Sequence, residues 1–201
     1  MCIILHKPSN IQLPDISTLK TCFNNNQDGA GFMYQHDNRV HIQKGFMSFN
    51  SLMTAIDHLQ QQKINITNTN LTIHFRLASH GRITASNCHP FPITKNQNKL
   101  KVKSCITDLA MVHNGIIPFT SYNRSTSDTI LFVKDYLSEI KDNLFNPITA
   151  ELISHATKSK FIIMSPDNIQ LIGDFIHDEY DQCYYSNESY IDYYGYYDKL
   201  L

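Results

Sequence analysis

Short apolar segments in this chain occur as neighbouring pairs, and longer stretches with helical spacing lie between the pairs. Residues 30–35 and 39–43 flank a His-Asp-Asn turn, and residues 160–164 and 169–175 flank a second turn that contains Pro166. Turn-forming residues between two strand-like runs predict hairpins of antiparallel strands. Strands and helices that come in blocks, not in alternating strand–helix–strand units, favour an α+β fold over a doubly wound parallel sheet.

The other predicted elements follow from apolar spacing and from capping residues. Strands are predicted at 2–5, 71–75 and 109–113, and helices at 15–23, 49–62, 127–140 and 147–156. In the helix at 127–140, Ser127 is in the capping position. Four apolar residues of that helix share its predicted buried face: Ile130, Val133, Leu137 and Ile140. Residues 95–103 hold four lysines and no acidic residue, which favours a solvated loop or hairpin.

The composition excludes several classes of protein. The 201 residues suit one domain with a small appendage, and the net charge of −1 is not that of a dedicated nucleic-acid binder. No apolar run approaches the roughly 18 residues of a membrane span, and the first residues do not resemble a signal peptide. Five scattered cysteines without a Cys-x-x-Cys pair favour reduced thiols and no metal site. A cytoplasmic protein is expected.

The C-terminal residues differ in composition from the rest of the chain. Residues 174–201 carry seven acidic side chains and one lysine, and eight of the eleven tyrosines lie between Tyr180 and Tyr197. Such a segment could be a packed β-like flap, a partner-docking arm or a loosely ordered tail. A surface tail is the simplest interpretation. We therefore predict a domain at 2–175 and an acidic, Tyr-rich C-terminal tail at 176–201.

Cys2 is the first candidate for chemistry. Removal of the initiator Met is favoured when the second residue is small, and it would leave Cys2 with a free α-amine. An α-amine titrates near neutral pH, at about 7.7–8.0, and can therefore act as a general base. One residue would then supply both the nucleophile and its base. Taken alone, a cysteine at position 2 is more often incidental.

Four later segments change the interpretation of Cys2. They occur in the order Ile73-His74-Phe75-Arg76-Leu77-Ala78-Ser79-His80-Gly81, Asn87-Cys88-His89-Pro90, Val112-His113-Asn114-Gly115 and Ser127-Asp128-Thr129. Together with Cys2 they resemble the glutaminase domain of class II glutamine amidotransferases, as fused to glucosamine-6-phosphate synthase and phosphoribosylpyrophosphate amidotransferase. The resemblance covers residues 2–175.

The resemblance implies a fold and an activity. The fold would be the four-layer αββα sandwich of N-terminal-nucleophile hydrolases, with two antiparallel sheets. The enzyme would hydrolyse glutamine to glutamate and ammonia through a γ-glutamyl thioester, without a metal or organic cofactor. Relatives deliver the ammonia to a synthase domain. We therefore expect glutamine as substrate and either a separate ammonia-accepting synthase subunit as partner or an enzyme that acts alone, with no membrane or direct nucleic-acid partner.

The resemblance also assigns roles to residues. Cys2 would attack the side-chain amide, while Asn114 and the Gly115 N–H would stabilise the oxyanion. Arg76 would bind the α-carboxylate and Asp128 the α-ammonium group. Two further positions, Ser79 and His80, would line the glutamine pocket. His74, His89 and His113 are predicted to be buried, hydrogen-bonded structural residues and not bases.

The chain departs from the family pattern at two places. The stretch 25–31 keeps Asp28 and Gly31 but lacks the arginine that the family often carries there, and Leu77 replaces a frequent aromatic residue. These departures bear on how the loop over glutamine closes. Two alternatives are therefore kept open: a stand-alone amidase acting on another γ-glutamyl compound, and a non-catalytic module that binds an amino acid.

Overall fold

The computed structural model describes residues 2–78, 82–118 and 127–192. Within them the chain has an α+β fold with two antiparallel sheets, of seven and four strands, and five α-helices. The large sheet has the order β10 (Ile176–His177), β11 (Tyr184–Tyr185), β1 (Ile3–Lys7), β4 (Leu71–Phe75), β2 (Ala30–His36), β3 (Arg39–Phe46), β6 (Ser104–Thr107). The small sheet has the order β5 (Phe91–Pro92), β7 (Ala110–Asn114), β8 (Lys160–Met164), β9 (Ile169–Ile172).

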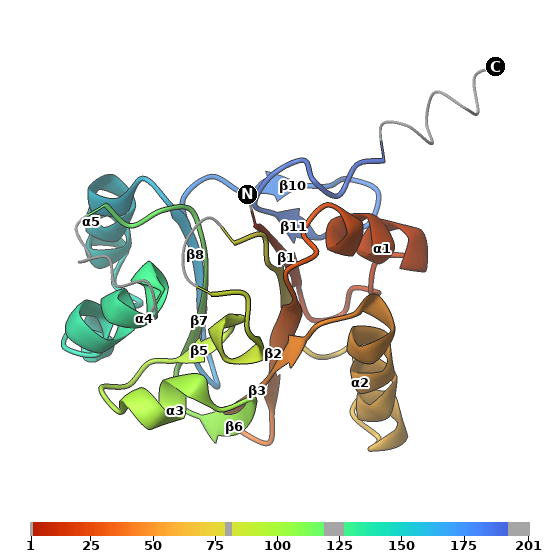
Figure 1. Cartoon of the computed structure of the whole chain (residues 1–201), viewed down its shortest axis with the longest axis horizontal. Helices are drawn as coiled ribbons and strands as arrows, with labels where there is room; N and C mark the ends of the chain where they lie inside the picture. Colours follow the sequence, from red (N-terminus) through yellow and green to blue (C-terminus); the bar gives the residue numbers. More distant parts are fainter. Residues whose placement is uncertain (1, 79–81, 119–126, 193–201) are drawn as a thin grey trace.

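Three apolar clusters hold these elements together. The helices α1 (Ile16–Asn24) and α2 (Phe49–Gln61) pack on one face of the large sheet, where Leu19 and Ile56 meet Phe32. The two sheets face each other across a second cluster that contains Ile4 and Val112. The helices α4 (Asp128–Phe132) and α5 (Pro147–Thr157) cover the outer face of the small sheet. Figure 1 shows the two helical groups on opposite sides of the sheets.

The predicted hairpins and most predicted elements are confirmed. The strands β2 and β3 pair around Asp37 and Asn38, whose positive φ angles of 49° and 56° suit a tight turn between antiparallel strands. The second hairpin is formed by β8 and β9, although β9 ends at Ile172 and not at residue 175. The helices predicted at 15–23, 49–62 and 147–156 correspond to α1, α2 and α5.

Two predicted segments differ from the structure. The helix expected at 127–140 begins after Ser127, whose Oγ accepts a hydrogen bond from the Ile130 N–H at 3.3 Å, but α4 gives way to a π-helical turn at Val133–Leu137. The apolar residues of this segment therefore do not all point to the same side, and Ile140 is partly exposed instead of buried. The lysine-rich segment 95–103 is not only loop, because it contains α3 (Gln97–Lys101), capped by Asn96 and anchored by the buried Leu100.

The described part of the C-terminal segment packs into the large sheet and is not a surface tail. Strand β11 pairs with β1 through Leu5 and Tyr185, and β10 pairs with β11 at the sheet edge. Cys183 and Tyr185 are fully buried, and the Tyr185 ring stacks on Tyr190 at 3.8 Å between centroids. The acidic, Tyr-rich composition suggested a solvated surface, whereas the apolar faces of tyrosine rings from this segment pack in the core beside the large sheet. None of the described helices is long and apolar enough to cross a membrane.

Replacing Tyr185 with Ala is expected to lower the free energy of unfolding by about 3–5 kcal/mol, because it leaves a large cavity beside β1. Tyr180→Ala is the matched control, since the Tyr180 side chain is 94% exposed and its loss should change stability by less than about 0.5 kcal/mol. Urea unfolding of both variants measures the difference. Equal stability of the two variants would contradict the packing of this segment.

Candidate active site

Four of the predicted site residues line one small cleft. The chain reaches it from the start of β1, the ends of β4 and β7, and the start of α4, so the cleft joins both sheets and one helix. The lining residues are Cys2, Arg76, Leu77, Ala78, Asn87, His89, His113, Gly115, Ser127, Asp128 and Thr129. Cys2, Arg76, Gly115 and Asp128 are thus brought together from widely separated positions. The cleft has a volume of about 30 Å³.

Of the other predicted site residues, one lies beside the cleft lining and two are not described. Asn114 is the last residue of β7 and is buried directly before Gly115, and its side-chain Nδ2 donates to Ser186 Oγ at 2.9 Å. Ser79 and His80 lie outside the described residues, so their predicted place in the glutamine pocket stays a prediction.

The Cys2 thiol contacts the backbone that follows β4. Its Sγ lies 3.4 Å from the Leu77 N–H nitrogen and 3.4 Å from the Leu77 carbonyl oxygen. Burial raises the pKa of the Cys2 thiol, and this effect outweighs the opposing influence of the Leu77 hydrogen bond and the Arg76 charge. The thiol is therefore protonated at neutral pH, and a nucleophilic role requires a base next to it.

Arg76 is a buried cation at the end of β4. Only 4% of its surface is exposed, and its Nη1 donates to the Arg82 carbonyl at 3.3 Å. Its backbone is clamped by the loop before β2, because the Arg76 N–H donates to Gly29 O and the Asp28 N–H donates to Arg76 O. Asp28 Oδ2 in turn accepts from the Ala78 N–H at 2.7 Å. The loop thereby fixes the direction in which the Arg76 side chain leaves the sheet.

Asp128 is held at the first position of α4 by backbone donors. Its Oδ2 accepts from the Ile117 N–H at 3.0 Å, and its Oδ1 accepts from the Thr129 N–H at 2.8 Å. Each carboxylate oxygen can accept more than one hydrogen bond. An ammonium group in the cleft could therefore still bind this carboxylate. Arg76 and Asp128 give the cleft one fixed cation and one fixed anion.

Glycine is required at two positions because other segments of the chain approach closely there. A Cβ on Gly31 would lie 2.2 Å from the His89 carbonyl oxygen, so no other residue fits where β2 passes the segment before β5. At Gly115, the φ of +146° and a Cβ position 2.2 Å from Ser159 Oγ both exclude a side chain. The absence of a side chain leaves the backbone after Asn114 open to the cleft.

Three buried histidines lie close together beside the cleft, with their rings tilted relative to one another. The ring centroids of His74 and His89 are 4.1 Å apart, and those of His89 and His113 are 6.3 Å apart. All three are buried, as predicted. His74 Nε2 lies 3.0 Å from the His113 carbonyl and His113 Nδ1 lies 3.0 Å from Thr129 Oγ1. Among the described residues neither ring nitrogen of His89 has a hydrogen-bond partner, which differs from the prediction for that residue.

Burial keeps this histidine cluster neutral. Desolvation lowers the pKa of His74 to about 3 and that of His113 to about 4, and it holds the pKa of His89 well below its usual value. The carboxylate of Asp128 partly opposes the shift at His113. None of the three rings is therefore in the charged, doubly protonated form at neutral pH, which agrees with a structural role and not with that of a charged acid.

The described residues offer no cluster of three or more side chains that could hold a metal ion. The chain matches no family model and no curated protein. The assignment of a function therefore depends on the cleft itself.

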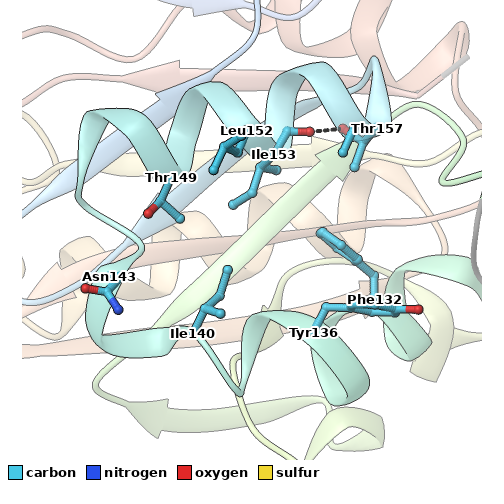
Figure 2. A pocket seen from close by; sticks show the side chains of 9 residues that line it. Phe132, Tyr136, Ile140, Asn143, Thr149, Leu152, Ile153 and Thr157 are labelled. Carbon is cyan, nitrogen blue, oxygen red and sulfur yellow. Dashed lines mark hydrogen bonds between the residues drawn. The ribbon is translucent and has the colours of Figure 1, made fainter.

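A second and larger cavity has a different character. It has a volume of about 370 Å³ and lies between α5 and the turns that follow α4. Figure 2 shows Leu152 and Ile153 of α5 facing Phe132, Tyr136 and Ile140. The cavity is lined mainly by apolar side chains and contains no thiol, no carboxylate and no basic group.

Two contributors were missed by the sequence reasoning. Ser186 and Asn187 follow β11 and contact the site residues, although they belong to the segment expected to be a surface tail. No local pattern distinguishes this Ser-Asn pair from others in the chain. The preceding Tyr185 is fully buried in the structure, and the acidic, tyrosine-rich composition gave no sign of this.

Proposed function

We propose that this chain is a class II glutamine amidotransferase domain that hydrolyses glutamine to glutamate and ammonia with Cys2 as nucleophile. The observation that carries the proposal is the convergence of Cys2, Arg76, Gly115 and Asp128 on one cleft. The order of helices, large sheet, small sheet and helices supports a four-layer αββα sandwich of the N-terminal-nucleophile type.

The charges of the cleft match those of free glutamine. The Arg76 guanidinium can bind the α-carboxylate with two parallel hydrogen bonds, and Asp128 can bind the α-ammonium group. The side-chain amide would then extend toward Cys2. A cleft of about 30 Å³ is smaller than glutamine, so binding requires it to widen between Arg76 and Asp128. A fixed charge pair favours amino acids over neutral amides, which gives the site its specificity.

The reaction begins with the processed N-terminus. After loss of Met1, the α-amine of Cys2 takes the proton of the Cys2 thiol, either directly or through a water molecule. The thiolate attacks the side-chain carbonyl carbon of glutamine, and the oxygen becomes an oxyanion. The Asn114 amide and the Gly115 N–H donate to that oxygen, and one such donor contributes about 3–4 kcal/mol to transition-state stabilisation.

The intermediate then collapses in two steps. The C–N bond breaks, the protonated α-amine gives its proton to the leaving nitrogen, and ammonia departs from a γ-glutamyl thioester on Cys2. Water attacks the thioester with the α-amine again as base, the C–S bond breaks, and glutamate leaves with the thiol restored. The neutral histidine cluster takes no part in either proton transfer.

Covalent labelling with a diazoketone analogue of glutamine tests the proposal. We expect the intact mass of the wild-type protein to show loss of Met1 and gain of one adduct, both established by peptide mapping at Cys2. Cys2→Ala should lose the adduct. Cys105→Ser, which removes a partly buried thiol at the opposite edge of the large sheet, should keep it.

Two results would contradict the proposal: retention of Met1, or a processed chain that forms no adduct. Ammonia release from glutamine, compared with release from other γ-glutamyl amides, separates a glutaminase from an amidase that uses the same residues. Binding of glutamine without ammonia release from either substrate class would identify a non-catalytic binding module.

A further inference from the structure

The chain after β11 runs beside the strand that carries Cys2. The Ser186 N–H donates to the Ile4 carbonyl at 2.9 Å, which extends the pairing of β11 with β1 toward the N-terminus (Figure 1). Lys160 of β8 donates from Nζ to the Ser186 carbonyl at 2.6 Å. Ser186 is thereby fixed by one strand of each sheet.

The Ser186 hydroxyl connects the proposed nucleophile strand with the proposed oxyanion donor. Its Oγ accepts from the Ile4 N–H at 2.8 Å and from Asn114 Nδ2 at 2.9 Å. A hydroxyl oxygen has two lone pairs, and both are used by these donors. Ser186 is only 1% exposed, so water does not compete for them. One N–H of the Asn114 amide is therefore held at Ser186, and the orientation of the second N–H is fixed with it.

The next residue holds Cys2 itself. Asn187 donates from Nδ2 to the Cys2 carbonyl at 2.7 Å. The orientation of the Asn187 amide is fixed in turn, because its Oδ1 accepts from the Ser189 N–H at 3.0 Å and from the Ser189 hydroxyl at 2.6 Å. Since the carbonyl, the amine and the thiol of Cys2 share one Cα, restraint of the carbonyl restrains the base and the nucleophile together.

We propose that Ser186 and Asn187 are positioning residues of the Cys2 site: Ser186 orients the Asn114 amide toward the oxyanion, and Asn187 orients Cys2. This inference rests on the proposed glutaminase function. It also gives the acidic C-terminal segment a role, because the site is incomplete without two residues from it. Preorganised donors and nucleophiles accelerate a reaction only when they are held in the reactive geometry.

Steady-state kinetics of glutamine hydrolysis test the two residues. Ser186→Ala and Asn187→Ala are each expected to lower kcat about tenfold or more, with KM for glutamine within about threefold, because Arg76 and Asp128 are untouched. Ser165→Ala is the matched control, since its hydroxyl forms hydrogen bonds with the backbone of Asn168 in the β8–β9 turn, away from the cleft. Thermal unfolding of each variant measures how much of the protein is folded.

A double-mutant cycle separates positioning from general destabilisation. If Ser186 acts through Asn114, then Asn114→Ala combined with Ser186→Ala should have the kcat of Asn114→Ala alone, within about twofold. A fold-loss in kcat of the double variant that equals the product of the two single fold-losses would overturn the role of Ser186. An unchanged kcat in Ser186→Ala would overturn it as well. Asn187→Ala keeps the inference testable if Ser186→Ala does not fold, because Asn187 is only partly buried.

A measurement without substrate distinguishes this inference from the function it rests on. The side-chain amide protons of Asn114, assigned in NMR spectra by comparison with Asn114→Ala, should exchange slowly in the wild-type protein and faster in Ser186→Ala. Unchanged exchange would overturn the inference. A wild-type protein that shows the protected amide but neither hydrolyses glutamine nor forms the diazoketone adduct would instead overturn the proposed function.

Discussion

Replacing Cys2 with Ser is expected to lower kcat for glutamine hydrolysis by at least about 10³-fold, because removal of a nucleophile alone can abolish most of an enzyme's rate enhancement. Serine keeps the α-amine and nearly the same shape. Its hydroxyl, however, has a much higher pKa than a thiol, so an amine base cannot ionise it to a useful extent. Because the pKa of the Cys2 thiol is itself raised, deprotonation of the nucleophile depends more strongly on the base.

Glutamine binding should be nearly unaffected in the same variant. In the proposed site, Arg76 and Asp128 would supply the charged contacts to the substrate, and neither contact involves the sulfur atom. Isothermal titration with glutamine should give a Kd within about threefold of the wild-type value under conditions that block turnover of the wild type. Cys105→Ser is the control for loss of a partly buried thiol elsewhere. Substantial turnover in Cys2→Ser would contradict a thioester mechanism.

The convergence of the site could be predicted because its residues lie in short, ordered motifs. Cys2 begins a buried strand, Arg76 follows one, and Asp128 opens a helix after a serine cap. The motifs and their order predicted this convergence through the resemblance to class II glutaminase domains, because spacing alone does not show that segments of two sheets meet. The two hairpins were also predictable, since turn residues and alternation are local signals.

Other parts of the structure depend on pairings that no local pattern encodes. Ser186 contacts Ile4 from the opposite end of the chain, and its partner Asn114 lies in the other sheet. A serine whose hydroxyl bridges two sheets has no characteristic spacing in the sequence. The π-helical turn at Val133–Leu137 was missed for a similar reason: its residues have ordinary helical spacing, and tertiary packing decides how the helix winds.

The free energy of unfolding is expected to fall by about 2 kcal/mol for each histidine of the buried cluster between pH 7 and pH 5. His74 and His113 have folded-state pKa values of about 3 and 4, and that of His89 is also well below the usual value. An unfolded histidine titrates near pH 6.5, so the unfolded state binds more protons than the folded state between that value and the folded pKa. Stability is therefore complete above about pH 6.5 and is lost progressively below it.

The charges around the histidine cluster also favour a loss of stability at low pH. Lys44 and Arg76 both oppose protonation of His89, and only Asp128 acts in the other direction, on His113. The His74 and His89 ring centroids are only 4.1 Å apart, so the two rings would repel each other if both were charged. A total loss of about 4–6 kcal/mol is a large share of the stability of a typical domain, so a marked loss of stability is expected near pH 5.

Urea unfolding at pH 7 and pH 5 measures this loss, and one variant assigns it to the cluster. His89→Leu removes a ring that has no hydrogen-bond partner among the described residues, so it should reduce the loss between the two pH values by about 2 kcal/mol. His155→Gln is the matched control, because the His155 side chain is 69% exposed and lies outside the buried cluster. An identical loss in His89→Leu and the wild type would show that other groups cause the acid sensitivity. The same low pKa values that make the fold acid-sensitive also make the adjacent imidazoles weak bases, which favours the Cys2 amine as the base in the proposed mechanism.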